Sequence, residues 1–431
     1  MQETKSKFKV VLLSIPIVLG IFTGYVFQFS PTPLMHRIAE SFSLFRPDGT
    51  LDLVTLNTAE SIIFPFIILS SIFGVFVDQK FKTRNMYTMT LSMLAAGILL
   101  SGFAPKFSIF LIGRGIYGVG FGLSVVFIGS AIVQWYTPKQ SDIMFTITGL
   151  FPFSGTAVAF SALVPMSVSL NNSWKNVLML LGCVCILMLV FWLFCSKKLI
   201  RTTGDAVHQS EKLRDVYGFL LKNNTIRFLG ILFASDFFFY AFIGGVLVVF
   251  FQITGDMNET SAGLWAAVAF PGISFFGGIT SGWVMVKTGL KKPAIFSAQF
   301  IKLIGVVTIF AGGVSSVFPV IIVGVFFYGI GDGMVPPAMY SMIAGLDNMT
   351  PSRVGAGLSV VLSAGFISGI ISPIFGAWLS NLIADGSNIV NPMDAQAHGL
   401  TYSLFLIGIV SCLVCLVFSI PIKETGKKRN G

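Results

Sequence analysis

The sequence predicts an all-α polytopic membrane protein with twelve transmembrane helices arranged as two pseudo-symmetric six-helix bundles. Three observations support this prediction: the composition, a series of long apolar runs, and an internal repeat. Of the 431 residues, 54% are hydrophobic and only 11% are charged, whereas soluble domains contain about 25% charged residues. This composition excludes a soluble globular protein.

Twelve apolar runs each approach or exceed the roughly 20 residues that a helix needs to cross a bilayer. Because lipid offers no hydrogen-bond partners and no run alternates with a period of two, we expect helices rather than barrel strands. The first run is too long, and too poor in a cleavage site, for a removed signal peptide. The runs lie at about 9–29, 56–77, 86–104, 107–135, 142–167, 175–196, 227–252, 261–286, 293–314, 317–345, 354–383 and 401–422.

An internal repeat relates the two halves of the chain. Residues 113–122 (GRGIYGVGFG) and 324–333 (GVFFYGIGDG) lie 211 positions apart and share one tyrosine and four glycines without a gap. Glycines at this spacing let helix backbones approach closely in lipid. The repeat therefore predicts two homologous bundles, 1–196 and 227–431, joined by a polar connector at 197–226.

Positive charge is concentrated in alternate loops. With the amino terminus inside, 22 of the 28 Lys and Arg residues lie in cytoplasmic segments, four lie in outer loops, and two, Arg114 and Lys302, lie within runs. This asymmetry follows the positive-inside rule, so we expect both termini in the cytoplasm of a plasma (inner) membrane protein. It also accounts for the net charge of +10 without nucleic-acid binding. Within the connector we expect a short surface helix at 207–221.

The loops after the second and eighth runs carry a related pattern. The first copy combines Gly74 and Asp78 with a basic cluster that ends at Arg84. The second copy keeps Gly282 and Gly289 with its basic residues but lacks the acidic one. Together, these loops resemble those between helices two and three, and eight and nine, of the major facilitator superfamily. The resemblance implies transport by alternating access, and Asp78 could latch the halves by pairing with Arg84 or by capping a neighbouring helix.

The fourth run carries an arginine at membrane depth, which is a functional hypothesis by default. Arg114, followed by Tyr117 and two further glycines, resembles the fourth-helix pattern of the same superfamily, which implies a role in proton coupling. The alternative is an arginine that binds nearby helix backbone for structure only. In the fifth run, residues 149–155 (GLFPFSG) partly match the pattern of exporters in this superfamily, and a simple helix kink is the alternative.

Carboxylates in the seventh and tenth runs are the other candidate site residues. At ~1.5 Å per residue, Asp236 lies about 14 Å deep, with Tyr240 one turn further on. An unpaired carboxylate at that depth favours its protonated form, which makes Asp236 a candidate proton carrier or ligand. The alternative is a carboxylate permanently tied to a neighbouring helix. Asp332 is also deep, precedes two prolines typical of a gating helix, and has Lys302 as a candidate partner. Glu60 is expected near the outer surface, in contact with solvent.

The remaining polar, aromatic and sulfur-containing residues do not identify a particular chemical role. Tyr25 and Gln28, late in the first run, either line a solute path or form an ordinary interfacial end, and a long outer loop is expected at 30–55. The 44 Phe residues are expected mostly to face lipid, and no aromatic site is assigned. The five cysteines are expected to fill apolar helices, and the three histidines are isolated on loops. We predict no metal site and no cofactor.

These observations predict a secondary active transporter of a small organic solute. The chain has no ATP-binding Gly-Lys-Ser/Thr loop and no nucleophile–base constellation in its runs, which argues against an ATP-driven pump and an enzyme. A proton gradient is the expected energy source, with Arg114, Asp236 and Asp332 as the buried titratable set. One hypothesis is uptake of an organic anion held by Arg114; the others are export of amphipathic cations, and a uniporter or exchanger without proton coupling. A non-transporting sensor would be expected to carry long cytoplasmic domains. A monomer is expected.

Overall fold

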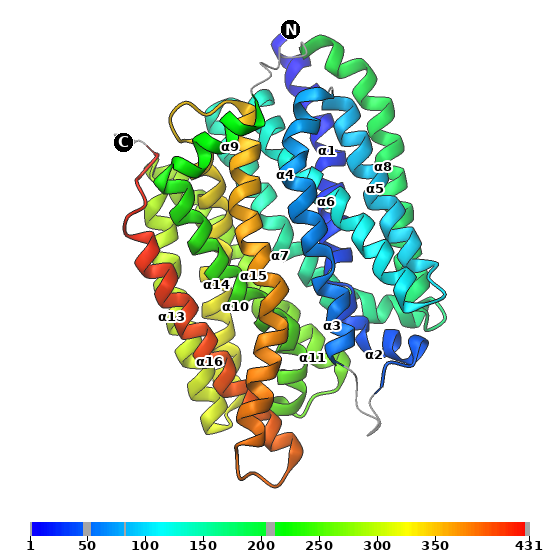
Figure 1. The fold of residues 1–431 in the computed structure, drawn as a ribbon, viewed down its shortest axis with the longest axis vertical. Coiled ribbons are helices and arrows are strands. Elements are labelled where there is room, and N and C mark those ends of the chain that lie inside the picture. The colour runs from blue at the N-terminus through cyan, green and yellow to red at the C-terminus, as the bar shows by residue number, and fades with distance from the viewer. Residues whose placement is uncertain (1, 46–52, 82, 204–211, 427–431) are drawn as a thin grey trace.

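The computed structural model describes residues 2–45, 53–81, 83–203 and 212–426, and these residues form helices and connecting loops without extended sheet (Figure 1). The first half contains α1 (Gln2–Gln28), α2 (Pro31–Phe42), α3 (Leu53–Ser61), α4 (Ile63–Lys80), α5 (Thr83–Gly102), α6 (Phe107–Trp135), α7 (Pro138–Ser169) and α8 (Trp174–Thr203). The remainder contains α9 (Leu213–Lys222), α10 (Asn224–Gly255), α11 (Glu259–Ala267), a π-helical turn (Val268–Gly272), α12 (Ile273–Thr288), α13 (Lys292–Ser315), α14 (Phe318–Ala344), α15 (Pro351–Asp385) and α16 (Pro392–Ser419).

The helices match the twelve predicted spans. In the described chain, ten helical stretches are long and apolar enough to cross a membrane, and the bent pair of α1 and α2 makes eleven. One stretch joins α3 to α4, and another joins α11 to α12 through the π-helical turn. Helix α5 packs along α6 and α8 and occupies the twelfth position. The all-α, twelve-helix prediction is therefore confirmed.

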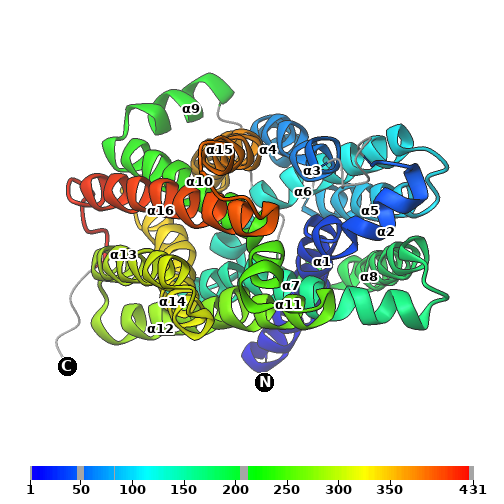
Figure 2. The same cartoon turned by 90° about the horizontal axis from the view of Figure 1, so that it is seen from below.

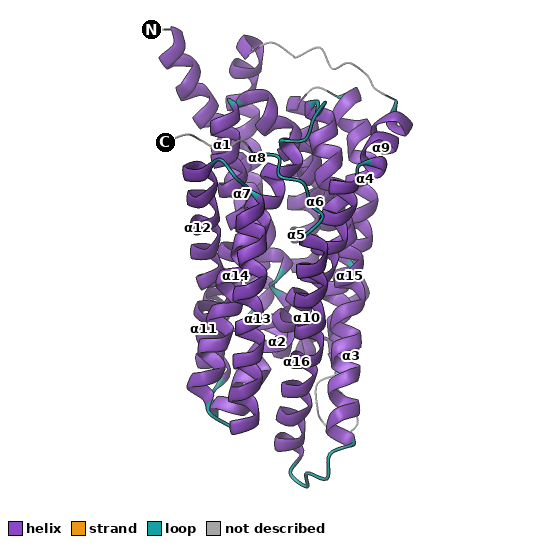
Figure 3. Ribbon diagram, turned by 90° about the vertical axis from the view of Figure 1, so that its left-hand side faces the viewer, coloured by secondary structure: helices purple, strands orange, loops and turns teal. Residues whose placement is uncertain are grey.

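The helices form two groups that lie side by side. Seen along the helix axes, α1 to α8 gather on one side and α10 to α16 on the other, with α7 and α11 near the boundary (Figure 2). The amino-terminal end, α9 and the carboxyl-terminal end all lie at the same end of the molecule (Figures 1 and 3). This placement is what an even number of spans requires.

The two halves repeat their closest helix contacts. A Cβ atom added at Gly97 of α5 would lie 2.7 Å from the carbonyl oxygen of Gly113 in α6. A Cβ added at Gly305 of α13 would lie 2.7 Å from the carbonyl oxygen of Gly324 in α14. Neither separation leaves room for a side chain, so the same pair of helices in each bundle depends on glycine for its close approach. The glycine repeat thus encodes two copies of one packing contact.

Helix caps repeat as well. Thr137 caps α7, and its backbone amide donates to Gln140 Oε1 at 3.1 Å in a capping box. Thr350 caps α15, where its hydroxyl accepts from the backbone amide of Arg353 at 3.3 Å. Both caps precede a proline at the first helical position, where the missing N–H has no cost.

Some boundaries differ from the prediction. Part of the expected outer loop, 30–55, forms α2, which is bent by 51° from α1. Its first residue, Pro31, starts the helix because proline fits the first turn. Helix α16 begins at Pro392 rather than near 401, because the Asn391 side chain caps it by accepting from the amide of Met393 at 3.0 Å.

The connector contains a short amphipathic helix, as expected. Helix α9 begins at Leu213, and residues 207–211 of the predicted helix lie outside the described residues. Val216 and Leu220 are buried, and the Tyr217 hydroxyl donates to the Ile72 carbonyl of α4 at 2.7 Å. The helix therefore packs against the end of the transmembrane region.

Candidate functional site

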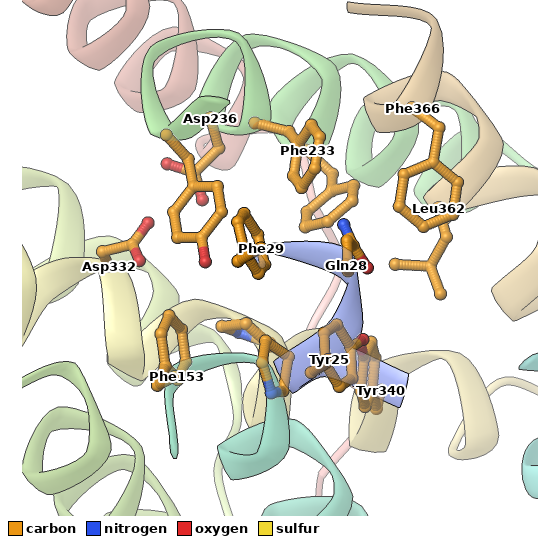
Figure 4. Close-up of a pocket in the computed structure, with 14 residues that line it drawn as sticks. Tyr25, Gln28, Phe29, Phe153, Phe233, Asp236, Asp332, Tyr340, Leu362 and Phe366 are labelled. Carbon is orange, nitrogen blue, oxygen red and sulfur yellow. The ribbon is translucent and has the colours of Figure 1, made fainter. Parts of the chain in front are cut away.

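A central cavity lies at the boundary between the two groups of helices. It is lined by side chains of α1, α7, α10, α14 and α15 and has a volume of about 520 Å³, part of which is open to solvent (Figure 4). Both groups of helices contribute to its walls, so a shift of one against the other would reshape it.

Aromatic rings form most of the cavity wall, although the number of aromatic residues in the sequence assigned no aromatic site. Eight of the fourteen lining residues are Phe or Tyr. Tyr240 lies at their centre: its ring stacks on Phe237 at 5.4 Å and meets the edges of Phe29 and Phe153 at 6.1 and 6.3 Å between centroids. The count of phenylalanines in a sequence cannot separate rings that face lipid from rings that face a cavity.

A buried ion pair stands in one wall of the cavity. The Lys302 ammonium donates to Asp236 Oδ1, and both residues are almost fully buried. Lys302, the candidate partner of Asp332, therefore pairs with Asp236 instead, and Asp236 is a carboxylate tied to a neighbouring helix. The ammonium compensates the Asp236 carboxylate, which removes most of the cost of burying that charge.

Asp332 is the second carboxylate of the cavity and lies close enough to both members of the ion pair for electrostatic interaction. Its side chain is only 3% exposed, and its Oδ2 atom has no hydrogen-bond partner among the described residues. One ammonium thus stands beside two carboxylates. An isolated buried carboxylate is costly, and a proton or an incoming cation removes that cost.

Other predicted polar residues also line the cavity. The structure places Tyr25 and Gln28 of α1 in its wall. Gln28 is 3% exposed, and within the described part of the chain its Oε1 atom has no donor. The hydroxyl of Tyr240 lies 3.5 Å from the Thr156 hydroxyl of α7. These contacts bring α1, α7 and α10 together around one space.

Arg114 lies behind the cavity rather than in its wall. It is fully buried, and its two terminal nitrogens donate to the carbonyls of Phe27 and Gln28 at 3.1 and 2.8 Å. These carbonyls belong to the last turn of α1, whose acceptors have no partner within the helix. Tyr117 similarly donates to the Gly24 carbonyl at 2.8 Å. This geometry is that of an arginine bound to nearby helix backbone, which was the alternative to a role in proton coupling. The two hydrogen bonds hold in place the turn that carries Gln28.

Glu60 also differs from expectation. It is half-buried rather than solvated, and it accepts a hydrogen bond from the Thr32 hydroxyl of α2. Its carboxylate lies within electrostatic range of the Arg114 guanidinium. Glu60 therefore supports the bend between α1 and α2, close to the end of α1 that Arg114 holds.

The predicted switch residues of the first loop have separate partners. Asp78 is 2% exposed, and its Oδ1 atom accepts from the Ser130 hydroxyl of α6 at 3.2 Å. Arg84 donates to the Ser196 hydroxyl at 3.1 Å and the Leu193 carbonyl at 3.5 Å, both in α8. The structure thus directs Arg84 to α8 and not to Asp78, so the expected pairing is not the observed contact.

The glycines of both loops serve packing and turning. A Cβ at Gly74 would lie 3.2 Å from Val126 of α6, whereas one at Gly282 would lie 2.9 Å from the Thr146 hydroxyl of α7, across the boundary between bundles. Gly289 ends α12 with a φ of 74°, a left-handed conformation that favours glycine.

The bundles touch closely between the cavity and the end that carries both termini. A Cβ at Gly129 of α6 would lie 2.9 Å from the Cα of Gly355 in α15. The hydroxyls of Ser71 in α4 and Ser363 in α15 lie 3.3 Å apart. Toward the opposite end, a second hollow of about 850 Å³ opens between α2, α7, α10 and α11.

No histidine or cysteine is among the described residues that line the central cavity. His36 lies in α2 and His398 in α16, so these two are on helices rather than on loops, and His208 lies outside the described residues. Cys412 and Cys415 are buried in α16. The described residues contain no group of three or more His, Cys, Asp or Glu side chains arranged to hold a metal.

Comparisons with known proteins agree with this architecture. The family model described as Major Facilitator Superfamily matches residues 17–344. The fold is similar to the proton:xylose symporter XylE bound to 6-bromo-6-deoxy-D-glucose, with a TM-score of 0.73, 14% identity and 97% of each chain covered. It is also similar to a bacterial homolog of the human lysosomal transporter Spinster in an inward-facing, unoccupied conformation, with a TM-score of 0.67, 14% identity and 96% of each chain covered. No curated protein sequence matches the chain.

Proposed function

The chain belongs to the major facilitator superfamily, and from that premise we propose that it is a proton-coupled secondary transporter of a small organic solute that works by alternating access. Its fold is that of membrane transporters with two six-helix bundles. In such proteins the solute site lies near the middle of the membrane, between the bundles. The central cavity occupies that position in this chain.

The observation that carries the coupling proposal is the cluster of Asp236, Lys302 and Asp332. The ammonium pairs with Asp236, and Asp332 Oδ2 has no partner among the described residues. Asp332 is therefore the group that gains and loses the proton, while Asp236 and Lys302 hold the local charge. Because Asp332 also lines the cavity, its protonation state and the presence of solute affect each other.

Alternating access requires the bundles to part where they now touch. We assign residues 1–196 and 227–431 to the two moving bundles and 197–226 to the connector. The contacts of Gly129 with Gly355 and of Ser71 with Ser363 close the end that carries the termini. Opening that end would give the cavity its second exit.

The proposal also covers the orientation of the chain in the membrane. The concentration of Lys and Arg in loops at the termini's end supports a cytoplasmic location for both termini in a plasma (inner) membrane. We propose a monomer, since each chain holds a complete cavity between its own bundles.

Proton flux in proteoliposomes tests the coupling. A panel of organic cations, anions and neutral solutes is added to vesicles that hold wild type or Asp332→Asn, with internal pH as the readout. Asp385→Asn serves as the matched control, because Asp385 is exposed at the end of α15. We expect solute-driven proton movement in wild type and in the control, and none in Asp332→Asn.

Two results would contradict the coupling. Transport of a solute without proton movement in wild type would indicate a uniporter or exchanger. Unchanged proton movement in Asp332→Asn would remove Asp332 from the coupling site and return that role to Asp236.

A further inference from the structure

We infer that the solute of the central cavity is an amphipathic organic cation with an N–H donor, such as a protonated aromatic amine. This inference rests on the proposed transport function and names the substrate class for the same cavity. It favours the sequence-based hypothesis of amphipathic cations over that of an anion held by Arg114, and it adds the requirement for an N–H donor. Three properties of the cavity support it: its unpaired acceptors, its charge and its rings.

Two buried oxygens in the cavity wall have no donor among the described residues. They are Gln28 Oε1 and Asp332 Oδ2, on side chains that are each 3% exposed. Buried acceptors are nearly always paired in folded proteins, so an unpaired acceptor that faces a cavity marks a place where a ligand supplies the donor. The two residues belong to different bundles, and in the view of Figure 4 the ring of Phe29 lies between Asp332 on the left and Gln28 on the right.

The charge of the cavity favours a cation. The Lys302 ammonium pairs with Asp236 and also lies within electrostatic range of Asp332, so the cluster holds one positive group and two carboxyl groups. None of the described residues that line the cavity is Lys or Arg. Arg114 is engaged by the carbonyls at the end of α1. An anion in this space would therefore meet more carboxyl groups than ammonium groups.

The rings favour an apolar body attached to the cation. Tyr240, Phe237 and Phe29 surround the space with ring faces and edges. Aromatic faces attract cations and cover apolar groups at the same time. A polyol would need a hydrogen-bond partner for each hydroxyl, and the wall supplies few besides Gln28, the two carboxylates and three tyrosine hydroxyls.

A matched series of small aromatic probes tests the substrate class. Phenethylammonium is the cation, 3-phenylpropionate the anion and phenethyl alcohol the neutral form of nearly the same shape, and phenethyltrimethylammonium keeps the charge without an N–H donor. Equilibrium binding is measured on purified full-length protein in detergent. We expect phenethylammonium to bind at least ~10-fold more tightly than each of the others, because a charge-assisted hydrogen bond requires both the charge and the donor.

Variants then locate the binding site. Asp332→Asn should weaken phenethylammonium binding by about 10- to 100-fold, and Gln28→Leu by about 10-fold. Asp385→Asn, outside the cavity, should bind as wild type does. A thermal melt identifies any variant that fails to fold. If Asp332→Asn is unstable, Gln28→Leu, which removes no charge, still tests whether the cation binds in this cavity.

The outcomes separate this inference from transport itself. Equal or tighter binding of the anion or the alcohol would overturn the cation class, and proton flux driven by 3-phenylpropionate would do so while leaving the proposed function intact. Selective phenethylammonium binding that depends on Asp332 and Gln28 would support the inference even if proteoliposomes showed no proton movement. Binding of the cation that is unaffected by both variants would overturn the site.

Discussion

The Glu424 carboxylate caps the amino end of α13 by accepting a hydrogen bond from the backbone amide of Lys292 at 2.9 Å. It also accepts from the amide of Lys291 at 3.0 Å. In the first bundle the corresponding loop carries its own carboxylate, Asp78. The second loop has Val286 at that place, so the carboxyl-terminal tail supplies the missing negative charge.

This relationship predicts that the tail stabilises the second bundle. Glu424→Ala removes the acceptor for the amides at the start of α13 and should lower the free energy of unfolding by about 1–2 kcal/mol. The apparent melting temperature in detergent should fall accordingly. Lys423→Ala is the matched control, because Lys423 is exposed in the same tail. Equal melting temperatures for the two variants would show that the tail contributes no stability.

The ion pair predicts a strong non-additivity. Lys302→Met leaves Asp236 buried without its counter-ion and should cost about 3–5 kcal/mol. The double variant Asp236→Asn with Lys302→Met removes both charges, so it should be more stable than Lys302→Met alone. The measurement is a double-mutant cycle of melting temperatures. If the double variant lost the sum of the two single losses, the residues would not be coupled in the folded protein.

The partners of buried charges could not be predicted from the sequence, because they depend on how each helix is rotated. Lys302 is closer in sequence to Asp332, yet its ammonium reaches Asp236, 66 residues earlier. Arg114 binds main-chain carbonyls of α1. Every residue has such a carbonyl, so no sequence pattern identifies this kind of partner. Glu424 has no counterpart in the repeat that would have drawn attention to it.

The order of helices could be predicted because its signals are local. Each apolar run is long enough to identify a span by itself, and the repeated glycines identified the helix pairs that pack closely. The predictions that differ from the structure concern residue types that occur in more than one structural setting. Pro31 lies in a segment that the sequence predicts as a loop, although proline at the first position starts a helix. The depth of Tyr240 along its helix does not indicate the rings that surround it.

Arg114 should act as a positioning residue for Gln28. Arg114→Met removes the guanidinium donor of the Gln28 carbonyl and one donor of the Phe27 carbonyl, which also accepts from Ser30, and should cost about 1–3 kcal/mol, whereas Arg114→Lys keeps the charge and should lose less. Phenethylammonium affinity should fall in both variants because the turn that carries Gln28 loses its support. Arg37→Met is the control, since among the described residues the Arg37 side chain donates its hydrogen bonds to Asn172. Normal affinity in a folded Arg114→Met protein would contradict this role.

The repeated glycine contact predicts matched losses in both bundles. Gly97→Ala and Gly305→Ala each place a methyl group against the backbone of the neighbouring helix and should destabilise the protein by about 1–3 kcal/mol. Gly244→Ala in α10 has no atom within 4 Å of the added Cβ. That variant should melt at or slightly above the wild-type temperature. A Gly244→Ala protein as unstable as the other two would show that the loss comes from replacing any helix glycine.

Movement between the bundles predicts that a covalent link across them stops transport. The hydroxyls of Ser71 in α4 and Ser363 in α15 lie 3.3 Å apart, so two cysteines at these positions are close enough for a disulfide after a small adjustment. The double variant Ser71→Cys with Ser363→Cys should oxidise readily and lose solute-driven transport in proteoliposomes. Reductant should restore activity, because the bond and not the substitution blocks the opening. Each single cysteine variant should transport under both conditions. Full transport by the oxidised double variant, with the disulfide verified by mass spectrometry, would show that these helices need not separate, and the exit would then have to form elsewhere between the bundles.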